Sequence, residues 1–258
     1  MNRRTILTPY FLNQTLPGLK KLAEDDWIIN QVELPEGDQV SQISVLHKSL
    51  ADQVEKIVRG DLLPVSLAGD CCTAIGVLAG LNRAGLYPLL IWFDAHGDFN
   101  TWETTPSGFL GGMPLAMLAG LGEQTLLEAL DLEPLVQERI ILTDGRDLDP
   151  GESELVANSL VTHLRNPMDL LDESFQDQPL WVHFDTDVVN TVESPAQNYP
   201  AAGGPGVEVL ENVFQYLADT GMIRAISVSS WAPGLPGEVQ SEAVSLRLIE
   251  ILVGGNNK

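Results

Sequence analysis

The chain has 258 residues, with 14 Lys and Arg against 36 Asp and Glu, so its formal net charge at pH 7 is −22. Hydrophobic residues make up 44% of the sequence, which is enough for a substantial core and excludes a wholly disordered chain. The acidity argues against nucleic acid and anionic membrane surfaces as partners, because both are bound through clustered Lys and Arg. It otherwise indicates only a solvated surface.

The two cysteines, Cys71 and Cys72, are adjacent and too few for a disulfide framework, so we expect a reducing compartment. Near the N-terminus, Pro9 and Pro17 interrupt any apolar run of the kind a signal peptide requires. No stretch approaches the roughly 18 apolar residues of a membrane span. We therefore expect a soluble, cytoplasmic protein without a membrane partner.

Short apolar runs alternate with helical patterns along the chain, as in proteins with a buried parallel sheet. The expected strands are residues 65–67, 88–93, 139–143, 180–184 and 223–228. A helix is expected over residues 43–57, where apolar residues recur every three or four positions. Two more are expected, one from Thr73 onward and one over residues 240–252, and a frayed tail should follow at 254–258. With no repeat, linker or break in composition, the pattern predicts one doubly wound α/β domain over residues 1–258.

Two expected strands end in unusual clusters of ligand-forming residues. Asp94, His96 and Asp98 follow one strand, and Asp185 and Asp187 follow another. Residues two apart in an extended segment point to the same side, and ligands bind beyond the carboxyl ends of parallel strands. Four carboxylates in one cleft repel one another unless cations neutralise them. The carboxylate and imidazole donors suit Mn²⁺, and also Zn²⁺, Fe²⁺ or Co²⁺, and two such ions would activate a water molecule.

The ordinary alternative is that an aspartate at a strand end caps the following helix or fills a turn. That explanation suits a single aspartate. Two aspartate pairs at two strand ends favour a metal site instead.

Three motifs in this order resemble those of the arginase, agmatinase and formimidoylglutamase family, the ureohydrolases. DAHGDFN at 94–100, followed by TTPSG at 104–108, is similar to the family's DAHxDxN segment. HFDTDVVN at 183–190 is similar to SxDxDxxDP, and RDLDPGE at 146–152 resembles a loop near the outer end of the substrate. The resemblance implies a three-layer α/β/α sandwich, a small-molecule substrate, two Mn²⁺ ions and a homo-oligomer, a trimer or hexamer.

The resemblance also implies residue roles. It makes metal ligands of Asp94, His96, Asp98, Asp185 and Asp187, with Asp94 and Asp185 as bridges between the ions. Cys71 occupies the position of the sixth ligand, a histidine in the family, within the segment AGDCC at 68–72. A thiolate there would favour Zn²⁺ or Fe²⁺ over Mn²⁺; alternatively the ligand is lost and Cys71 is a small buried hydrophobe. Substrate contacts are expected at Asn100, Ser107, Asp147 and Asp149.

Other positions depart from the family pattern. Gly111 stands where the family has a histidine for proton transfer, Ser230 where it has a glutamate that pairs with the guanidinium, and Asn190 where it has a third aspartate. A guanidinium in a partly desolvated pocket requires an opposing carboxylate, and Ser230 supplies only a hydrogen bond. Arginine and agmatine are therefore weaker candidate substrates than the resemblance suggests.

Two further side chains are candidates with an ordinary alternative. Trp231 would contact a cationic substrate through its ring, or else pack in the core. His183 is expected on the same side of its strand as Asp185, so it is a candidate proton shuttle or extra ligand, or else a hydrogen-bonded core histidine.

Three functions remain open from the sequence. The first is a metal-dependent hydrolase of C–N bonds in a guanidine, amidine or related amide, with Asp98 or Asp187 accepting a proton from the attacking water. The second is a catalytically impaired family member with a structural or regulatory role. The third, an amide hydrolase of the fold-related deacetylase kind, is disfavoured because the glycine-rich segment 108–112 has no paired histidines.

Overall fold

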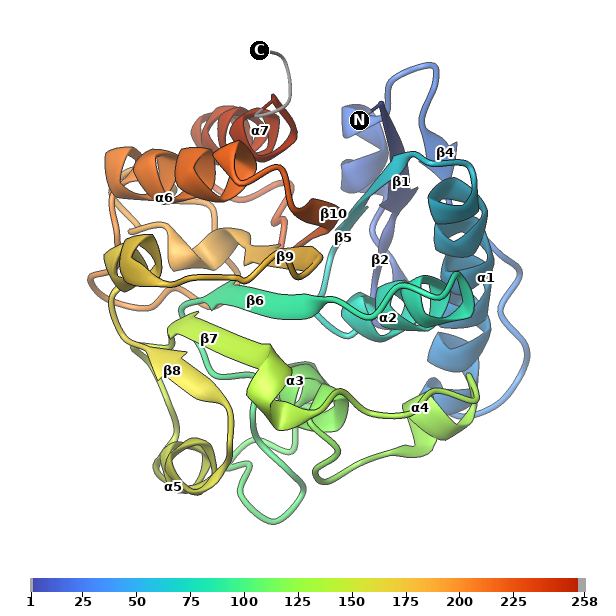
Figure 1. Ribbon diagram of the computed structural model, residues 1–258. Helices are drawn as coiled ribbons and strands as arrows, with labels where there is room; N and C mark the ends of the chain where they lie inside the picture. The colour runs from blue at the N-terminus through green and yellow to red at the C-terminus, as the bar shows by residue number, and fades with distance from the viewer. Residues whose placement is uncertain (1, 255–258) are drawn as a thin grey trace.

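The structure, a computed structural model, describes residues 2–254. Of the tail expected at 254–258, Gly254 is the last residue of a helix, and residues 255–258 lie outside the described residues. The central sheet has the strand order β4 (Ile28–Ile29), β1 (Arg3–Thr8), β5 (Leu63–Ala68), β10 (Ile223–Ser229), β9 (Leu180–Asp185), β6 (Leu89–Asp94), β7 (Ile140–Asp144) and β8 (Thr162–Leu164) (Figure 1). All neighbouring strands in it are parallel. A separate antiparallel pair joins β2 (Tyr10–Phe11) to β3 (Gln14–Thr15).

Helices cover both faces of the sheet. The α-helices are α1 (Gln39–Arg59), α2 (Thr73–Arg83), α3 (Pro114–Leu118), α4 (Thr125–Glu128), α5 (Pro150–Asn158), α6 (Val207–Asp219) and α7 (Glu238–Gly254). Short 3₁₀ helices lie at Pro17–Leu22, Leu110–Gly112, Gln137–Arg139, Pro167–Asp172 and Thr186–Val188. Helices α1 and α2 lie on one side of the sheet and α6 and α7 on the other (Figure 1).

Alternation along the strands creates one apolar core on each face. In β6, Leu90 and Trp92 belong to the core beneath α1 and α2, whereas Ile91 and Phe93 belong to the core beneath α6 and α7. A strand buried on both faces has to be apolar at every position, which explains its continuous apolar sequence. The predicted three-layer α/β/α sandwich is confirmed.

The first long helix shows why these segments fold as they do. Asp38 caps α1 by accepting a hydrogen bond from the Ser41 backbone N–H at 2.9 Å, and the helix ends at Gly60. Its buried stripe packs against α2 so closely that a Cβ at Gly80 would lie 2.6 Å from the Ala51 carbonyl oxygen. Glycine is therefore required at this helix crossing.

The five expected strands are confirmed as β5, β6, β7, β9 and β10, each within two residues of its predicted bounds. The expected helices at 43–57 and 240–252 form the central parts of α1 and α7, and the helix expected from Thr73 is α2. Strands β1, β4 and β8 were not predicted. Strands β4 and β8 are short and lie at the two sheet edges, so their pairing depends on neighbours that local periodicity does not reveal.

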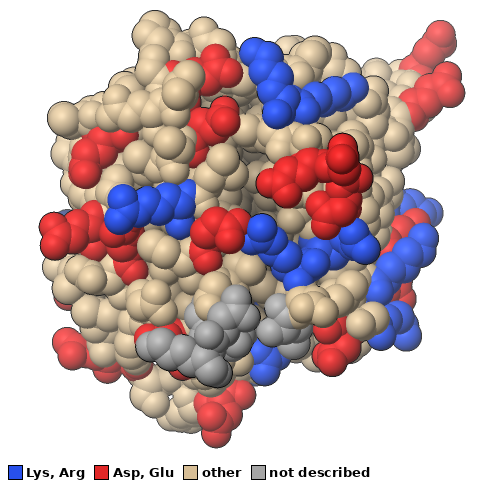
Figure 2. Space-filling view, turned by 90° about the horizontal axis from the view of Figure 1, so that it is seen from above, with Lys and Arg blue, Asp and Glu red and all other residues tan. Residues whose placement is uncertain are grey.

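The surface carries both signs of charge. The face seen from above the view of Figure 1 shows acidic and basic side chains interspersed among uncharged ones (Figure 2). Exposed ion pairs such as Arg3–Glu250 and Arg4–Asp26 contribute little stability individually. None of the helices in residues 2–254 has both the length and the apolar character needed to cross a membrane.

Candidate metal centre and substrate cleft

Five adjacent strands end together and place the candidate residues at one edge of the sheet. Phe93 of β6 pairs with Phe184 of β9, so Asp94 and Asp185, one residue further along, emerge side by side. On the other side of β9, Ser229 of β10 pairs with Asp185. Strand β5 ends at Ala68, and Gly69 and Asp70 connect it to Cys71. The parallel register thus brings together segments more than a hundred residues apart in the sequence.

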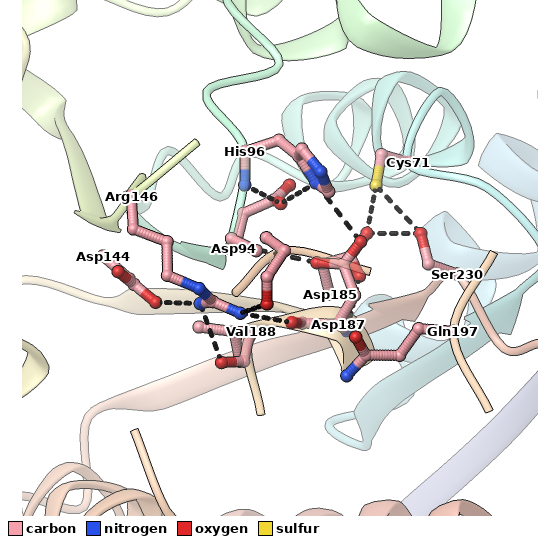
Figure 3. A network of polar contacts seen from close by, with 12 residues as sticks. Cys71, Asp94, His96, Asp144, Arg146, Asp185, Asp187, Val188, Gln197 and Ser230 are labelled. Atoms are coloured by element: carbon pink, nitrogen blue, oxygen red, sulfur yellow. Dashed lines mark hydrogen bonds and ion pairs between the residues drawn. The ribbon is translucent and has the colours of Figure 1, made fainter. Parts of the chain in front are cut away.

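Two groups of potential ligands share Asp94. In each group the ligand atoms lie within 4.8 Å of one another: Cys71, Asp94 and Asp185 form one, and Asp94, His96 and Asp187 form the other. Ligand atoms on opposite sides of one ion, each about 2.0–2.3 Å from it, are separated from each other by nearly this distance. Figure 3 shows the Cys71 sulfur beside Asp185 and Ser230, and the His96 ring beside Asp94 and Asp187. The arrangement fits two neighbouring ions with Asp94 between them.

His96 is oriented by the carboxylates on both sides of it. Its Nδ1 lies 3.2 Å from Asp187 Oδ2 and 3.4 Å from Asp94 Oδ1. Burial by itself would lower the pKa of His96, but the hydrogen bonds and negative charges of Asp187 and Asp94 raise it to about 12. The two carboxylates therefore favour positive charge at this position.

The carboxylates themselves are buried with too little positive charge to balance them. Asp94, Asp98, Asp185 and Asp187 are each at most 6% exposed. Burial raises the pKa of Asp98 well above its usual range, and the charges of Asp94 and Asp185 raise it further. Asp98 Oδ2 is buried and has no hydrogen-bond partner. Because a buried, unpaired carboxylate oxygen is costly, these residues fit a site for divalent cations.

Three of the eight non-glycine residues with positive φ in residues 2–254 lie at the same sheet edge. Asp98, Asp144 and Ser230 have φ angles of 49°, 72° and 59°, in the left-handed region that non-glycine residues rarely adopt. Asp144 ends β7, and Ser230 directly follows β10. Strain of this kind is commonly retained where side chains must be aimed at a functional site.

A chain of buried hydrogen bonds supports Cys71 and Asp185 from behind. The Trp181 indole N–H donates to Ser227 Oγ at 2.9 Å, and Ser227 Oγ lies 2.8 Å from His183 Nδ1. His183 Nε2 lies 3.0 Å from Ser229 Oγ, which in turn lies 3.2 Å from Asp185 Oδ2. Burial lowers the pKa of His183 to about 3, so its ring is neutral.

His183 therefore lies behind the centre rather than in it. It is fully buried, its ring stacks on Trp92 with centroids 3.6 Å apart, and it does not line the cleft. The structure supports the alternative of a hydrogen-bonded core histidine, connected to Asp185 through Ser229.

Arg146 holds the other side of the centre. Its guanidinium pairs with Asp144 and donates to the backbone oxygens of Val188 at 3.0 Å and Asp187 at 3.1 Å (Figure 3). Burial raises the pKa of Asp144 to about 6, although the Arg146 charge opposes this. Arg146 was not predicted as a site residue; its position in the RDLDPGE motif was the available signal.

A cleft of about 440 Å³ opens above the carboxylates. Ten of the predicted site residues line it: Cys71, His96, Asp98, Asn100, Ser107, Asp147, Asp149, Asp185, Asp187 and Ser230. The Asn100 amide donates to Asp149 Oδ2 at 2.9 Å, which joins two of the expected substrate-binding segments. His96 is the only basic residue among the lining residues within 2–254, so the cleft is strongly acidic.

The position of the missing family histidine is covered by an aromatic ring. A Cβ at Gly111 would lie 2.3 Å from Cε1 and Cζ of Phe109. The Phe109 ring lies 6.1 Å from Phe11 and 5.6 Å from Tyr199, measured between centroids, and all three line the cleft. One wall of the cleft is therefore aromatic. The sequence pattern did not predict it, because its three members come from distant segments.

Two other motif residues lie away from the cleft. Trp231 is 6% exposed, packs in the core beneath α6 and α7, and lines a different, very small cavity. This agrees with the packing alternative for Trp231 and leaves no contact with a ligand in the main cleft. Asn190, at the position of the third family aspartate, accepts hydrogen bonds from the backbone N–H groups of Val192 and Glu193 in a turn.

Glu152 is a cleft residue that was not predicted to contribute to the site. It accepts hydrogen bonds from the Phe99 backbone N–H at 2.7 Å and the Asp149 backbone N–H at 3.0 Å, which ties α5 to the segment that follows Asp94. Burial raises the pKa of Glu152 to about 7. The signal in the sequence was an aspartate followed three residues later by glutamate, the pattern of a helix capping box.

Comparisons with known proteins agree with this geometry. Among curated relatives, an arginase of Bacillus subtilis (strain 168) is 28% identical over 241 residues, which cover 88% of this chain and 81% of that protein. An N(omega)-hydroxy-L-arginine amidinohydrolase of Streptomyces lavendulae is 31% identical over 178 residues, 67% of this chain and 60% of that protein. The crystal structure of the Bacillus subtilis arginase matches with a TM-score of 0.83 at 23% identity, covering 98% of this chain and 99% of that one.

The profile of the Arginase family matches residues 25–253. This match includes both strand ends that carry the aspartates and all the residues around the cleft except those of the first 24 positions. The chain belongs to the arginase family.

Proposed function

We propose that this protein is a metal-dependent hydrolase of a C–N bond in a small cationic substrate of the guanidine or amidine type. The observation that carries the proposal is the pair of ligand groups sharing Asp94 on the floor of an acidic cleft. Divalent ions bound there, with Mn²⁺ the expected ion at the His96 group, would supply Lewis-acid chemistry by lowering the pKa of a water molecule. The ions would be held by Asp94, His96, Asp98, Asp185 and Asp187, with Cys71 as the sixth ligand.

The chain's own residues perform the remaining tasks. Asp98 lines the cleft with an unpartnered carboxylate oxygen, so it is placed to accept a proton from an attacking water, with Asp187 as the other candidate. Asp147 and Asp149 line the same cleft and, by family resemblance, attract the outer part of a cationic substrate. Ser230 Oγ bonds to Asp185 and offers no charge to a guanidinium.

Two positions in the cleft disfavour the substrate suggested by the relatives' names. The position expected to hold the guanidinium-pairing glutamate carries Ser230, and the position of the proton-transferring histidine is closed by Phe109 over Gly111. A cation can still be bound, because Asp147, Asp149 and Glu152 line the cleft. Arginine itself is accordingly the weaker candidate, and an amidine or guanidine with an apolar portion facing Phe109 is the stronger one.

The test combines metal content with hydrolysis. Protein purified after supplementation with Mn²⁺ or Zn²⁺ is assayed for bound metal and for release of ammonia, urea or amine from a panel of guanidines, amidines and amides. We expect up to two ions per chain and hydrolysis of at least one cationic substrate. Asp94→Asn removes the ligand shared by both groups and is expected to abolish both signals, whereas Asp25→Asn changes an exposed carboxylate and leaves them intact.

The second candidate function is that of a catalytically impaired family member. Gly111 and Ser230, which stand at positions where the family has functional side chains, are the observations that favour it. Protein that binds metal and hydrolyses no member of the panel would support this alternative. Protein that binds no metal after supplementation would contradict the proposed hydrolase.

A further inference from the structure

The two ligand groups differ in donor chemistry. One contains the sulfur of Cys71 together with carboxylate oxygens of Asp94 and Asp185, and the other contains the His96 imidazole together with Asp94 and Asp187. Thiolate ligands favour Zn²⁺ and other thiophilic ions, whereas carboxylates favour hard ions such as Mn²⁺ and Mg²⁺. A sulfur in only one group therefore makes the two positions chemically unequal.

Cys71 borders both the apolar core beneath α1 and α2 and the polar groups at the cleft. Its Sγ lies 2.8 Å from Asp185 Oδ2, 3.0 Å from Ser229 Oγ and 3.8 Å from Ser230 Oγ. The Cys71 thiol and the hydroxyls of Ser229 and Ser230 all donate to Asp185 Oδ2. These hydrogen bonds orient Cys71 and Asp185 around one ligand position.

The neighbouring carboxylate supplies a second, independent sign of a ligand. Asp98 also lines the cleft, and its charge acts on Cys71. Asp98 Oδ2 is buried without a hydrogen-bond partner. A cation bound in this part of the cleft would give that oxygen the partner it lacks.

Cys72 provides the contrast within the same chain. It is fully buried in the core beneath α1 and α2, its Sγ donates to the Leu110 carbonyl oxygen at 3.7 Å, and it belongs to neither of the two groups of potential metal ligands. Cys72 is thus a small apolar side chain, whereas Cys71 lines the cleft.

We propose that the two ion positions select different metals: the Cys71 position binds a thiophilic divalent ion such as Zn²⁺ through the cysteine thiolate, and the His96 position binds a harder ion such as Mn²⁺. Binding replaces the Sγ–H bond of Cys71 with a sulfur–metal bond and releases one proton to solvent. The inference rests on the proposed function only because both concern the same metal centre. It concerns which ions bind, and it is measured without turnover.

The test uses Co²⁺ as a spectroscopic substitute for Zn²⁺. The full chain is freed of metal with a chelator, kept reduced, and titrated with Co²⁺ while the near-ultraviolet sulfur-to-cobalt charge-transfer absorption is recorded. We expect this band in the wild type and in Cys72→Ser, and its loss in Cys71→Ser. Cys71→Ser should also weaken Zn²⁺ binding at this position by at least about tenfold.

A second measurement follows Mn²⁺ by electron paramagnetic resonance. In protein preloaded with one equivalent of Zn²⁺, one Mn²⁺ per chain is expected to bind, and Asp187→Asn should weaken that binding while leaving the cobalt band in place. Cys71→His, which substitutes an imidazole for the thiol, should shift the first position toward Mn²⁺. It also serves as a folded alternative if Cys71→Ser proves unstable.

The outcomes separate this proposal from the proposed function. A Co²⁺-loaded wild type without the charge-transfer band, or with a band equal to that of Cys71→Ser, overturns the inference whether or not the protein hydrolyses a substrate. A band that depends on Cys71 supports the inference even if no substrate is hydrolysed. Failure of the wild type to bind any ion overturns both.

Discussion

The phenyl ring of Phe109 lies directly over the backbone of Gly111, where a Cβ would be 2.3 Å from two of its ring atoms. The loss of the family histidine at residue 111 is therefore coupled to the side chain two positions earlier. The ring also contacts Phe11 and Tyr199, so its position contributes to one wall of the cleft. Restoring a histidine at residue 111 alone would displace that wall.

A double-mutant cycle tests this coupling. Gly111→Ala should lower the free energy of unfolding by about 1 kcal/mol or more in the wild type, because the Phe109 ring must move. In a Phe109→Ala background the same change should cost close to nothing, which gives a coupling energy of roughly 0.5–3 kcal/mol. Gly112→Ala is the control, since nothing lies within 4 Å of a Cβ there. Equal costs in both backgrounds would contradict the coupling.

Arg146 is expected to stabilise the fold mainly by compensating Asp144. Arg146→Met leaves this buried carboxylate without its cation, so the free energy of unfolding measured by urea denaturation should fall by about 3–5 kcal/mol. Adding Asp144→Asn should recover part of the loss, because the uncompensated charge is then gone. Arg165→Met, at an exposed position, should have little effect. If the double variant loses as much stability as Arg146→Met and Asp144→Asn lose separately when added together, the two residues do not act as a pair.

Glu152 is expected to hold α5 against the segment that follows Asp94. Glu152→Ala removes the acceptor for the backbone N–H groups of Phe99 and Asp149, and should destabilise the protein by about 2–4 kcal/mol. The measurement is thermal or urea unfolding beside Glu154→Ala, which changes an exposed glutamate on the same helix. Comparable losses for both variants would show that these hydrogen bonds are unimportant.

His47 should make the fold less stable in mild acid. Burial lowers the pKa of His47 from 6.5 to about 3, so the unfolded state takes up the proton first as the pH falls. As the pH drops below about 6.5, the free energy of unfolding therefore decreases. The decrease is up to about 1.4 kcal/mol per pH unit until the pH approaches 3. His47→Leu removes this contribution, and the Nδ1 atom it deletes is buried without a hydrogen-bond partner.

The measurement is the free energy of unfolding of both proteins at pH 7.5 and pH 5. The wild type should lose more stability than His47→Leu over this interval. His183 titrates in both proteins, so its contribution cancels in the comparison. Identical pH dependence would mean that His47 does not remain neutral in the folded state.

The aspartates proposed as metal ligands were predictable because two rules coincide at them. Asp94 and Asp185 follow continuous apolar runs, and the carboxyl ends of parallel strands meet at one sheet edge. The cleft contains five of the six proposed metal ligands, and Asp94 lies buried beneath it. By contrast, His183 was expected on the side of Asp185 by strand periodicity, but periodicity does not reveal that Trp92 and Ser229 enclose its ring.

The apolar strands, the carboxylates at their ends and the unusual residues Cys71, Gly111 and Ser230 could be identified from the sequence, because each belongs to a local pattern along the chain. The surroundings of these positions depend on the folded chain. It covers Gly111 with Phe109, and it places Cys71 at the cleft beside hydroxyl and carboxylate groups, whereas Cys72 belongs to neither group of potential ligands. The physical reason is that burial, charge compensation and ring packing depend on contacts between segments far apart in the sequence, which the order of parallel strands brings together.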